Sequence, residues 1–170
     1  QKMYAENRPT YNIGACATTI TPDSVEYRSG AIGLGTWDTE AEYKDIRVTE
    51  NGKTTTLPDL AKATEVLTKL YDGTFGNNYT LELKARKISG AEGFLIFFGM
   101  SEDGKQGYRF NIGGWGNRTT ALQQLYAQGD QVVSREIPQR IEEGRWYDIR
   151  IELTQRVVKL YVDGKLIIDN

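Results

Sequence analysis

The chain has 170 residues, a formal net charge of −2 and no histidine, which suits one domain with a sizeable core. Basic residues are scattered among acidic ones, so nucleic acid is not an expected partner, and the absence of histidine excludes His-based triads and most zinc sites. No apolar run approaches the roughly 18 residues of a membrane span, so no membrane partner is expected.

The first predicted element is a hairpin. Ala31–Trp37 and Ala41–Val48 have strand-like composition and flank the polar turn Asp38–Glu40. Tyr43 and Ile46 both should face the core although they stand three positions apart. This spacing predicts a β-bulge between them, near residues 44–45.

The segment 54–76 is predicted to connect the two halves of the domain. Within it, apolar residues recur at a helix-like spacing after Pro58: Leu60, Ala63, Leu67 and Leu70. This pattern predicts one short helix over residues 58–70.

The C-terminal half is predicted to be an antiparallel meander. Residues 79–86 alternate strictly, which places Leu81, Leu83 and Ala85 on the core face. The continuous apolar run 94–98 indicates a strand buried on both sides. Later segments predict further strands and hairpins: 122–128 with 131–137 across Gly129-Asp130, 146–153, and 157–162 with 165–168 across Asp163-Gly164. The expected fold class is therefore all-β.

The stretch Tyr108–Asn117 is the main candidate for a binding site. It is an alternating strand that runs into glycines around Trp115. A flat ring next to fixed hydrogen-bonding side chains suits a sugar, because the ring covers the apolar CH face while arginine and amide groups hold hydroxyls. The candidate carbohydrate-binding residues are Trp115, Asn111, Arg109, Arg86, Glu82 and Trp37.

Within this set, Trp115 would stack on the sugar, and Trp37 would supply a second wall. Glu82 would accept hydrogen bonds from hydroxyls or orient Arg86. The alternative for Trp115 is a core role, in which its ring caps the sandwich from a bend. Trp146 begins a strand and is expected in the core.

Carboxylates give weaker signals. Asp38, Glu40 and Glu42 occur at every second residue, as in jelly-roll glycosidases. Because Asp38–Glu40 is also the predicted turn, the alternation is broken, and we expect solvated surface and no catalytic residue. Glu102 and Asp103 are typical of an ordinary charged turn. No metal site or cofactor is expected, with a structural calcium at this turn as the alternative.

Four segments together carry a family resemblance: Gly30–Asp38, Ala91–Ile96, Asn111–Asn117 and Gly144–Ile149. They resemble the concanavalin-like (laminin-G-like) carbohydrate-binding domain inserted in bacterial alpha-L-arabinofuranosidases of glycoside hydrolase family 51. The similarity covers roughly residues 1–50 and 75–170. It implies one jelly-roll β-sandwich domain over residues 1–170, with residues 1–10 as the tail of a preceding catalytic domain.

The resemblance also has functional implications. The parent enzyme would remove arabinofuranosyl groups from plant polysaccharides with glutamates of a separate barrel domain, so this domain would be non-catalytic. Its partners would be an arabinose-containing polysaccharide and the parent barrel. A periplasmic or extracellular location is implied too, although residues 1–7 lack the apolar core of a signal peptide.

Strand order relative to that family predicts a circular permutation. The hairpin 31–48 would close most laminin-G-like domains at the C-terminus, but here it comes first. Strands on the Val48 side should then pair near Leu166–Ile168 or near Leu81–Leu83, and the termini should lie close together. Three functions remain open: a glycan-binding accessory domain, a module that only packs on the parent barrel, and a stand-alone glycosidase.

Overall fold

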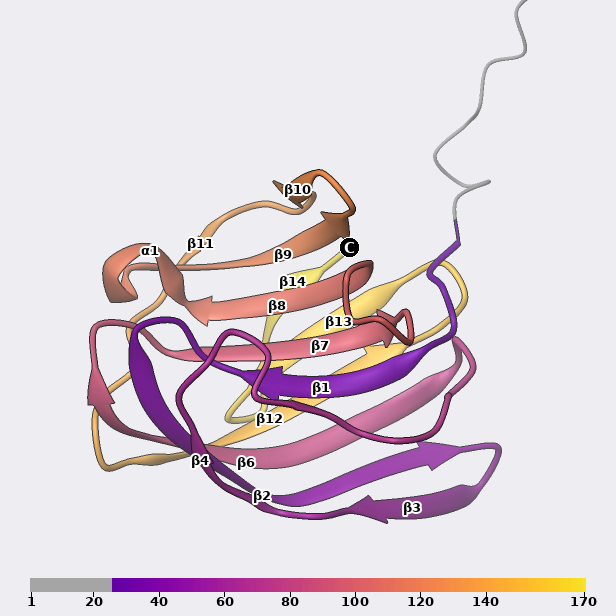
Figure 1. Ribbon diagram of the computed structural model, residues 1–170, viewed down its shortest axis with the longest axis horizontal. Helices are drawn as coiled ribbons and strands as arrows, with labels where there is room; N and C mark the ends of the chain where they lie inside the picture. The colour runs from indigo at the N-terminus through magenta and orange to yellow at the C-terminus, as the bar shows by residue number, and fades with distance from the viewer. Residues whose placement is uncertain (1–25) are drawn as a thin grey trace, which may run out of the picture.

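The computed structural model describes residues 26–170, which form two antiparallel sheets and one short helix (Figure 1). The predictions for residues 1–10 lie outside the described residues. One sheet contains β1 (Ala31–Gly35), β5 (Lys69–Leu70), β7 (Phe94–Met100), β8 (Gly107–Gly113), β9 (Thr119–Tyr126), β10 (Gly129–Val132) and β11 (Ile137–Pro138). The other contains β2 (Thr39–Glu50), β3 (Lys53–Leu57), β4 (Leu60–Ala63), β6 (Tyr79–Gly90), β12 (Trp146–Leu153), β13 (Val158–Val162) and β14 (Lys165–Asp169). The element labelled α1 (Gly114–Asn117) is a single turn whose backbone is left-handed at Trp115 and Gly116.

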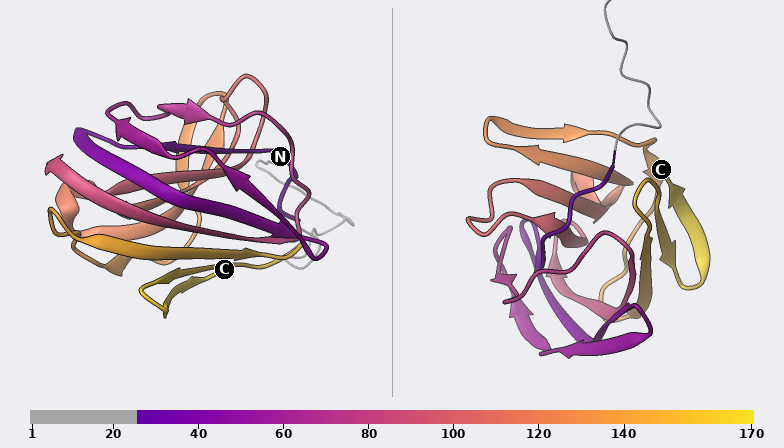
Figure 2. Two further views of the ribbon diagram at one scale, coloured as in Figure 1. Left: turned by 90° about the horizontal axis from the view of Figure 1, so that it is seen from below. Right: turned by 90° about the vertical axis from the view of Figure 1, so that its right-hand side faces the viewer.

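The strand order of the first sheet is β10-β9-β8-β7-β1-β5, with β11 paired to β9. The second sheet has the order β14-β13-β12-β6-β2-β3, with β4 paired to β2. The right-hand view of Figure 2 shows β8–β10 and β12–β14 as separate layers. The predicted all-β sandwich of two antiparallel sheets is thereby confirmed.

The main core lies between the sheets and follows the predicted alternation. On β6, Leu81, Leu83 and Ala85 are buried, and the residues between them are partly exposed. Every residue of β7 is buried, as the run 94–98 predicts. Phe94 and Phe98 contribute to the main core, whereas Leu95 and Phe97 belong to a second apolar cluster on the outer side of the first sheet.

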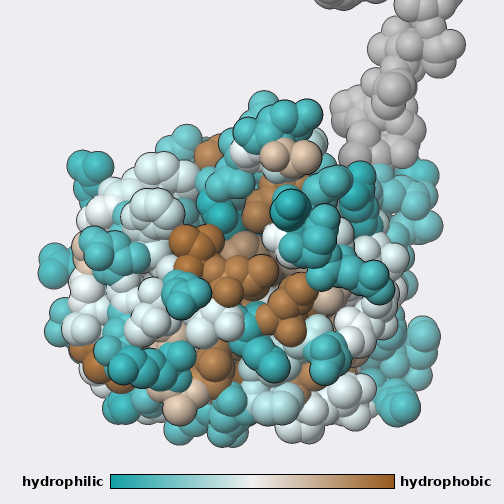
Figure 3. Space-filling model, viewed as in Figure 1, coloured by the Kyte–Doolittle hydropathy of each residue, from teal (hydrophilic) through white to brown (hydrophobic). Residues whose placement is uncertain are grey.

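Residues 65–70 cover this second cluster. Val66, Leu67 and Leu70 pack against it, and hydrophobic atoms gather at the centre of this face in Figure 3. The segment can lie so close because β1 has glycines at positions 33 and 35. A Cβ on Gly35 would lie 1.8 Å from the Val66 carbonyl oxygen, and one on Gly33 would lie 2.7 Å from Leu67 Cδ1.

The predicted helix over residues 58–70 is wrong, because this segment contains β4 and β5. Its apolar residues serve two different surfaces. Ala63 is buried in the main core through pairing of β4 with β2, whereas Leu67 and Leu70 pack on the outer cluster. The helix-like spacing of these residues therefore arises by chance, because they pack on two different surfaces of the sandwich.

The predicted hairpin over residues 31–48 is also wrong, because β1 and β2 belong to different sheets. Both edges of β1 are occupied, by β7 and β5, so the chain crosses to the second sheet after Gly35. Hydrogen bonds fix this crossing. Thr36 Oγ1 donates to the Gly93 carbonyl at 2.8 Å, and Thr39 Oγ1 accepts from Glu92 N at 2.8 Å.

Other local predictions are confirmed. The register of β2 against β6 shifts between Lys44 and Arg47, and Asp45 has a φ of 54°, as the bulge requires. The β13–β14 hairpin forms as predicted. In this hairpin, Asp163 and Gly164 both have positive φ, the backbone that a two-residue hairpin turn needs. The β9–β10 hairpin also forms, but its turn is Ala127-Gln128, because Gly129 and Asp130 pair with Tyr126 and Leu125 as strand residues.

A permuted strand order predicts that the strand containing Val48 pairs near Leu166–Ile168 or near Leu81–Leu83, and the second of these pairings is found. Val48 on β2 pairs with Leu81 on β6, whereas β14 lies at the far edge of the same sheet. Near the start of the described chain, the Tyr27 hydroxyl donates to the Asn170 carbonyl at 2.8 Å. Residue 27 therefore lies beside the last residue.

The hydroxyl of Tyr79 is buried and has no hydrogen-bond partner among residues 26–170. Burial, together with the charge of Glu50, raises its pKa. Removing an unpaired buried hydroxyl relieves a desolvation cost, so Tyr79→Phe should raise the free energy of unfolding by about 1 kcal/mol in urea denaturation. Tyr43→Phe is the matched control with the opposite expected sign, because the Tyr43 hydroxyl donates to the Gly35 carbonyl at 2.7 Å. Destabilisation by Tyr79→Phe would contradict the prediction.

Candidate functional site

A groove of about 340 Å³ lies on the outer side of the first sheet. It is called the tryptophan groove below, and its lining residues are Trp37, Glu92, Leu95, Arg109, Asn111, Trp115, Gln123 and Asp130. Four of the six predicted binding residues are thus brought together: Trp37, Arg109, Asn111 and Trp115.

The floor of the groove follows from the alternation of β8. Tyr108, Phe110 and Ile112 face the main core, so Arg109 and Asn111 project from the opposite side of the strand. Pairing with β9 places Gln123 opposite Arg109. The sheet therefore presents polar side chains from neighbouring strands at one spot.

These polar side chains form a network around Gln123. Its Oε1 accepts from Arg109 Nε at 2.8 Å and from Asn111 Nδ2 at 3.4 Å. Arg109 also pairs with Asp130 on β10, with Nη2 2.5 Å from Oδ2. Only two of the five guanidinium N–H donors are used in these contacts, so others are left for a ligand.

Two tryptophans form the walls of the groove. Trp37 follows β1 and is 56% exposed, and Trp115 follows β8 and is 37% exposed. Because β1 and β8 each run antiparallel to β7, both tryptophans leave the sheet at the same end. The exposure of Trp115 differs from the core role that the sequence left open.

The backbone around Trp115 is held in a left-handed turn. Trp115 has a φ of 52°, and Gly113, Gly116 and Asn117 also have positive φ. A tryptophan in this region costs on the order of 1 kcal/mol or more, so surrounding contacts must maintain it. Two of them are hydrogen bonds, from Gly116 N to Glu92 Oε2 at 2.8 Å and from Arg118 Nε to the Trp115 carbonyl at 2.9 Å.

The structure does not bring Arg86 and Glu82 to the groove, because both lie on β6 in the second sheet. Arg86 pairs with Glu42 at 2.9 Å, and Glu82 pairs with Arg47 at 3.6 Å. Glu82 therefore does not orient Arg86.

Trp146 is not in the core as expected. It is half-buried on the outer side of the second sheet, between the cations of Lys44 and Arg86, which lie 4.0 and 4.9 Å from its ring centre. It is separate from the tryptophan groove.

Sequence reasoning missed Glu92, Gln123 and Asp130. Asp130 was assigned only to a hairpin turn, and Gln123 only to a strand. The signal for Gln123 is its register: once β8 and β9 form a hairpin, it must lie opposite Arg109. Glu92 lies just before β7, and its carboxylate accepts from the backbone N–H of Gly116 in the Trp115 turn. No pattern in the sequence predicts this contact.

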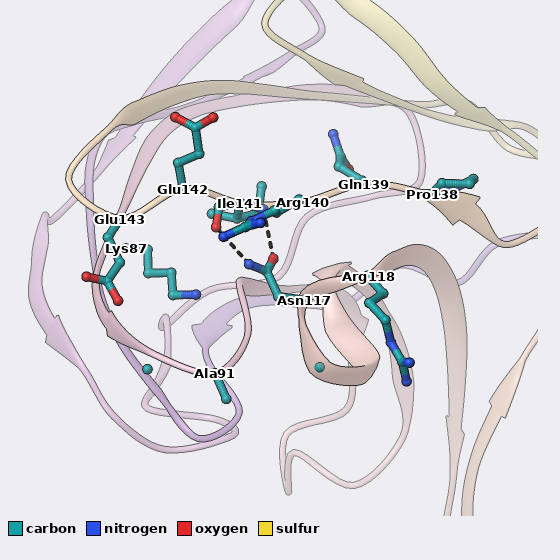
Figure 4. A pocket seen from close by; sticks show the side chains of 12 residues that line it. Lys87, Ala91, Asn117, Arg118, Pro138, Gln139, Arg140, Ile141, Glu142 and Glu143 are labelled. Carbon is teal, nitrogen blue, oxygen red and sulfur yellow. Dashed lines mark hydrogen bonds between the residues drawn. The ribbon is translucent and has the colours of Figure 1, made fainter.

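A second, larger cavity of about 820 Å³ lies at the same end of the sandwich, on the other side of the Trp115 turn (Figure 4). It is called the end pocket below. Its lining residues are Lys87, Gly90, Ala91, 116–118 and 138–143. Asn117 fixes one wall, because its side chain accepts from Ile141 N at 2.8 Å and donates to the Ile141 carbonyl at 2.9 Å. Lys87 lines this pocket.

The acidic candidates are dispersed. Asp38 has a φ of 48° and lies before β2, so it does not share the alternation of Glu40 and Glu42. Asp103 accepts from Ser101 Oγ at 2.7 Å and from Lys105 N at 3.0 Å, which lowers its pKa. Among residues 26–170, no cluster of three His, Cys, Asp or Glu residues is placed to hold a metal ion. Within the same residues, no helix is long and apolar enough to cross a membrane.

Comparisons with known proteins relate this chain to part of an arabinofuranosidase. No protein-family model matches. The chain is 32% identical over 192 aligned positions to an extracellular exo-alpha-L-arabinofuranosidase of Streptomyces chartreusis, covering 97% of this chain and 23% of that protein. It is therefore homologous to one segment of that enzyme, about a quarter of its length. Among solved structures, the carbohydrate-binding module CBM66 from Bacillus subtilis matches with a TM-score of 0.41 and 16% identity, over 84% of this chain and 66% of that one.

Proposed function

We propose that this chain is a non-catalytic carbohydrate-binding accessory domain of a polysaccharide-degrading enzyme, and that the tryptophan groove is its glycan site. The observation that carries this proposal is that two exposed rings, Trp37 and Trp115, line one groove together with a strip of hydrogen-bonding side chains. Ring faces pack against the CH surface of a sugar, and the strip meets its hydroxyls.

The chemistry of the strip favours a neutral polyhydroxyl ligand. Arg109 supplies charged donors, Asp130 and Glu92 supply acceptors, and the amides of Asn111 and Gln123 offer both. A hydroxyl group can donate and accept at once, so such a mixed surface matches it. A strongly charged ligand would instead meet groups of both signs and gain little.

The proposed parent is an arabinofuranosidase-like glycoside hydrolase that acts outside the cytoplasm. The homologous protein is named as an extracellular exo-alpha-L-arabinofuranosidase, and this chain matches about a quarter of it. That proportion supports a domain accompanying a separate catalytic unit. The proposed ligand is an arabinose-containing plant polysaccharide, bound weakly, because few contacts must offset the ordering of a flexible glycan.

The test is affinity electrophoresis with arabinan, arabinoxylan, fructan and galactan. We expect at least one glycan to retard the wild type, and Trp115→Ala to weaken binding by about tenfold, equivalent to about 1.4 kcal/mol. Trp146→Phe is the matched control and should bind normally, because Trp146 lies on the other sheet.

Each other outcome identifies a different function. Retardation by no glycan would favour a module that only packs on its parent barrel. Equal retardation of Trp115→Ala and wild type would show that the glycan binds elsewhere than in the tryptophan groove. Release of reducing sugar would show a catalytic domain.

A further inference from the structure

Lys87 occupies a position of β6 that the strand alternation reserves for the core. Leu81, Leu83 and Ala85 precede it at alternate positions and are buried, and Lys87 itself is only 3% exposed. Placing an ammonium group there costs free energy unless a partner compensates it. The Lys87 carbonyl accepts from Gly144 N at 2.8 Å, but its side chain forms no hydrogen bond or ion pair with any of residues 26–170. Lys87 Nζ is not among the buried unpaired side-chain atoms, so a largely buried side chain brings its ammonium group to the wall of a pocket, where a ligand can reach it.

The ammonium group of Lys87 is directed into the end pocket. In Figure 4 the side chain extends toward the space between Ala91 and Asn117. The pocket, at about 820 Å³, falls within the range of small-molecule sites, roughly 300–1,000 Å³. A ligand entering it would therefore have room to approach Lys87.

The charges that line the end pocket favour one negative charge on the ligand. Three side chains are basic, Lys87, Arg118 and Arg140, and two are acidic, Glu142 and Glu143. Both glutamates are exposed, and Figure 4 shows the Glu142 carboxylate pointing away from Lys87. The excess is thus a single positive charge. Burial lowers the pKa of Lys87 and Arg140 adds to this effect, while Glu143 and Glu92 oppose it.

The end pocket adjoins the tryptophan groove across one short turn. Trp115 lines the groove, and the next three residues, 116–118, line the end pocket. Glu92, on the groove side, accepts from Gly116 N at 2.8 Å. One glycan could therefore contact both cavities by crossing this turn.

We propose that the end pocket binds a uronate, a sugar residue bearing a carboxylate, and that Lys87 is the partner of that carboxylate. The assignment to a sugar rests on the proposed function of the neighbouring groove, whereas the assignment to a monoanion rests on Lys87 and its surroundings alone. A carboxylate carries the single negative charge that balances the pocket lining, and it would accept a charge-assisted hydrogen bond from the Lys87 ammonium group. A phosphate dianion would leave one negative charge unmatched.

The experiment is an NMR titration of the ¹⁵N-labelled protein with sodium glucuronate, with glucose, acetate and inorganic phosphate as comparison probes. We expect saturable shifts of the Ala91 and Asn117 amides with glucuronate and much smaller shifts with the other three. Lys87→Met should lower glucuronate affinity by about tenfold or more, since it removes one charge-assisted contact. Lys84→Met is the matched control, because Lys84 lies on the outer face of the same strand and pairs with Asp148.

Thermal unfolding separates a ligand-binding lysine from a structural one. Without ligand, Lys87→Met should unfold at the same or a higher temperature, because burial disfavours the charged form of Lys87 and its side chain has no hydrogen-bond partner among residues 26–170. A clear loss of stability together with unchanged glucuronate shifts would overturn the proposal. Equal or stronger binding of phosphate would overturn the uronate assignment, and equal binding of acetate would show that no sugar is recognised.

The two proposals fail separately. If neutral glycans do not bind but glucuronate binds through Lys87, the proposal that the tryptophan groove binds glycans is wrong, whereas the proposal for the end pocket is supported. If neutral glycans bind through Trp115 but glucuronate causes no shifts at Ala91 and Asn117, the proposal for the end pocket is wrong, whereas the proposal for the tryptophan groove is supported.

Discussion

Gly35→Ala is expected to lower the free energy of unfolding by about 3 kcal/mol, the upper part of the usual range for overpacking. The added methyl group would lie 1.8 Å from the Val66 carbonyl oxygen and 2.7 Å from that of Glu65, and both are backbone atoms that cannot rotate away. The segment 65–70 would have to leave β1. Its departure would expose the outer apolar cluster to water and break the hydrogen bond from Thr36 N to the Glu65 carbonyl.

Urea denaturation measures this effect, and the midpoint should fall while the slope changes little if the fold stays two-state. Gly76→Ala is the matched control, since a Cβ there would meet only the end of the flexible Glu50 side chain. A Gly35→Ala variant within about 0.5 kcal/mol of the wild type, the usual range for surface changes, would show that residues 65–70 do not need this close approach.

Arg109→Ala is expected to abolish measurable glycan binding, a loss of about 100-fold or more if two charge-assisted hydrogen bonds disappear. The guanidinium links Gln123 on β9 with Asp130 on β10 and is only 11% exposed. Without it, Asp130 loses its cation and the Gln123 amide loses its closest donor. The groove would therefore lose its shape as well as its donors.

Arg109→Lys is expected to rescue binding only in part, because an ammonium cannot reproduce the planar fork that contacts both partners. Isothermal titration with the glycan found by electrophoresis measures both variants. Arg150→Ala is the control, since Arg150 also pairs with a carboxylate, that of Glu152, and stacks over Tyr161, but lies in the second sheet. Normal glycan binding by Arg109→Ala would show that Arg109 does not contribute to the binding site.

Strand identity was predictable here because alternation is a local property. Residues 79–86 and the run 94–98 specify their own faces, and the spacing of Tyr43 and Ile46 specifies a bulge. Sheet membership was not predictable, because a polar turn such as Asp38–Glu40 looks the same whether it closes a hairpin or carries the chain to another sheet. Glycines at positions 33 and 35 were the missed signal, since two on one face of a strand indicate a close approach by other backbone.

The binding-site prediction divides in the same way. Arg109, Asn111 and Trp115 are close in sequence, so their proximity in space follows from one strand and its turn. Arg86 was assigned to the site because it faces away from its own core side, but a sandwich has two outer faces. Periodicity predicts that a side chain points away from the core, but it does not predict which of the two sheets the strand belongs to. Asp130 joins the groove only through the sheet order β8-β9-β10, which needs the whole fold.

The placement of the tryptophans gives the protein a built-in optical reporter. The whole chain contains three, and Trp37 and Trp115 both line one groove. Trp146 lies on the other sheet between two cations, so its emission should stay constant as a background. Any molecule that settles in the groove displaces water from both exposed indoles. Intrinsic fluorescence can therefore follow occupancy of the groove without a label.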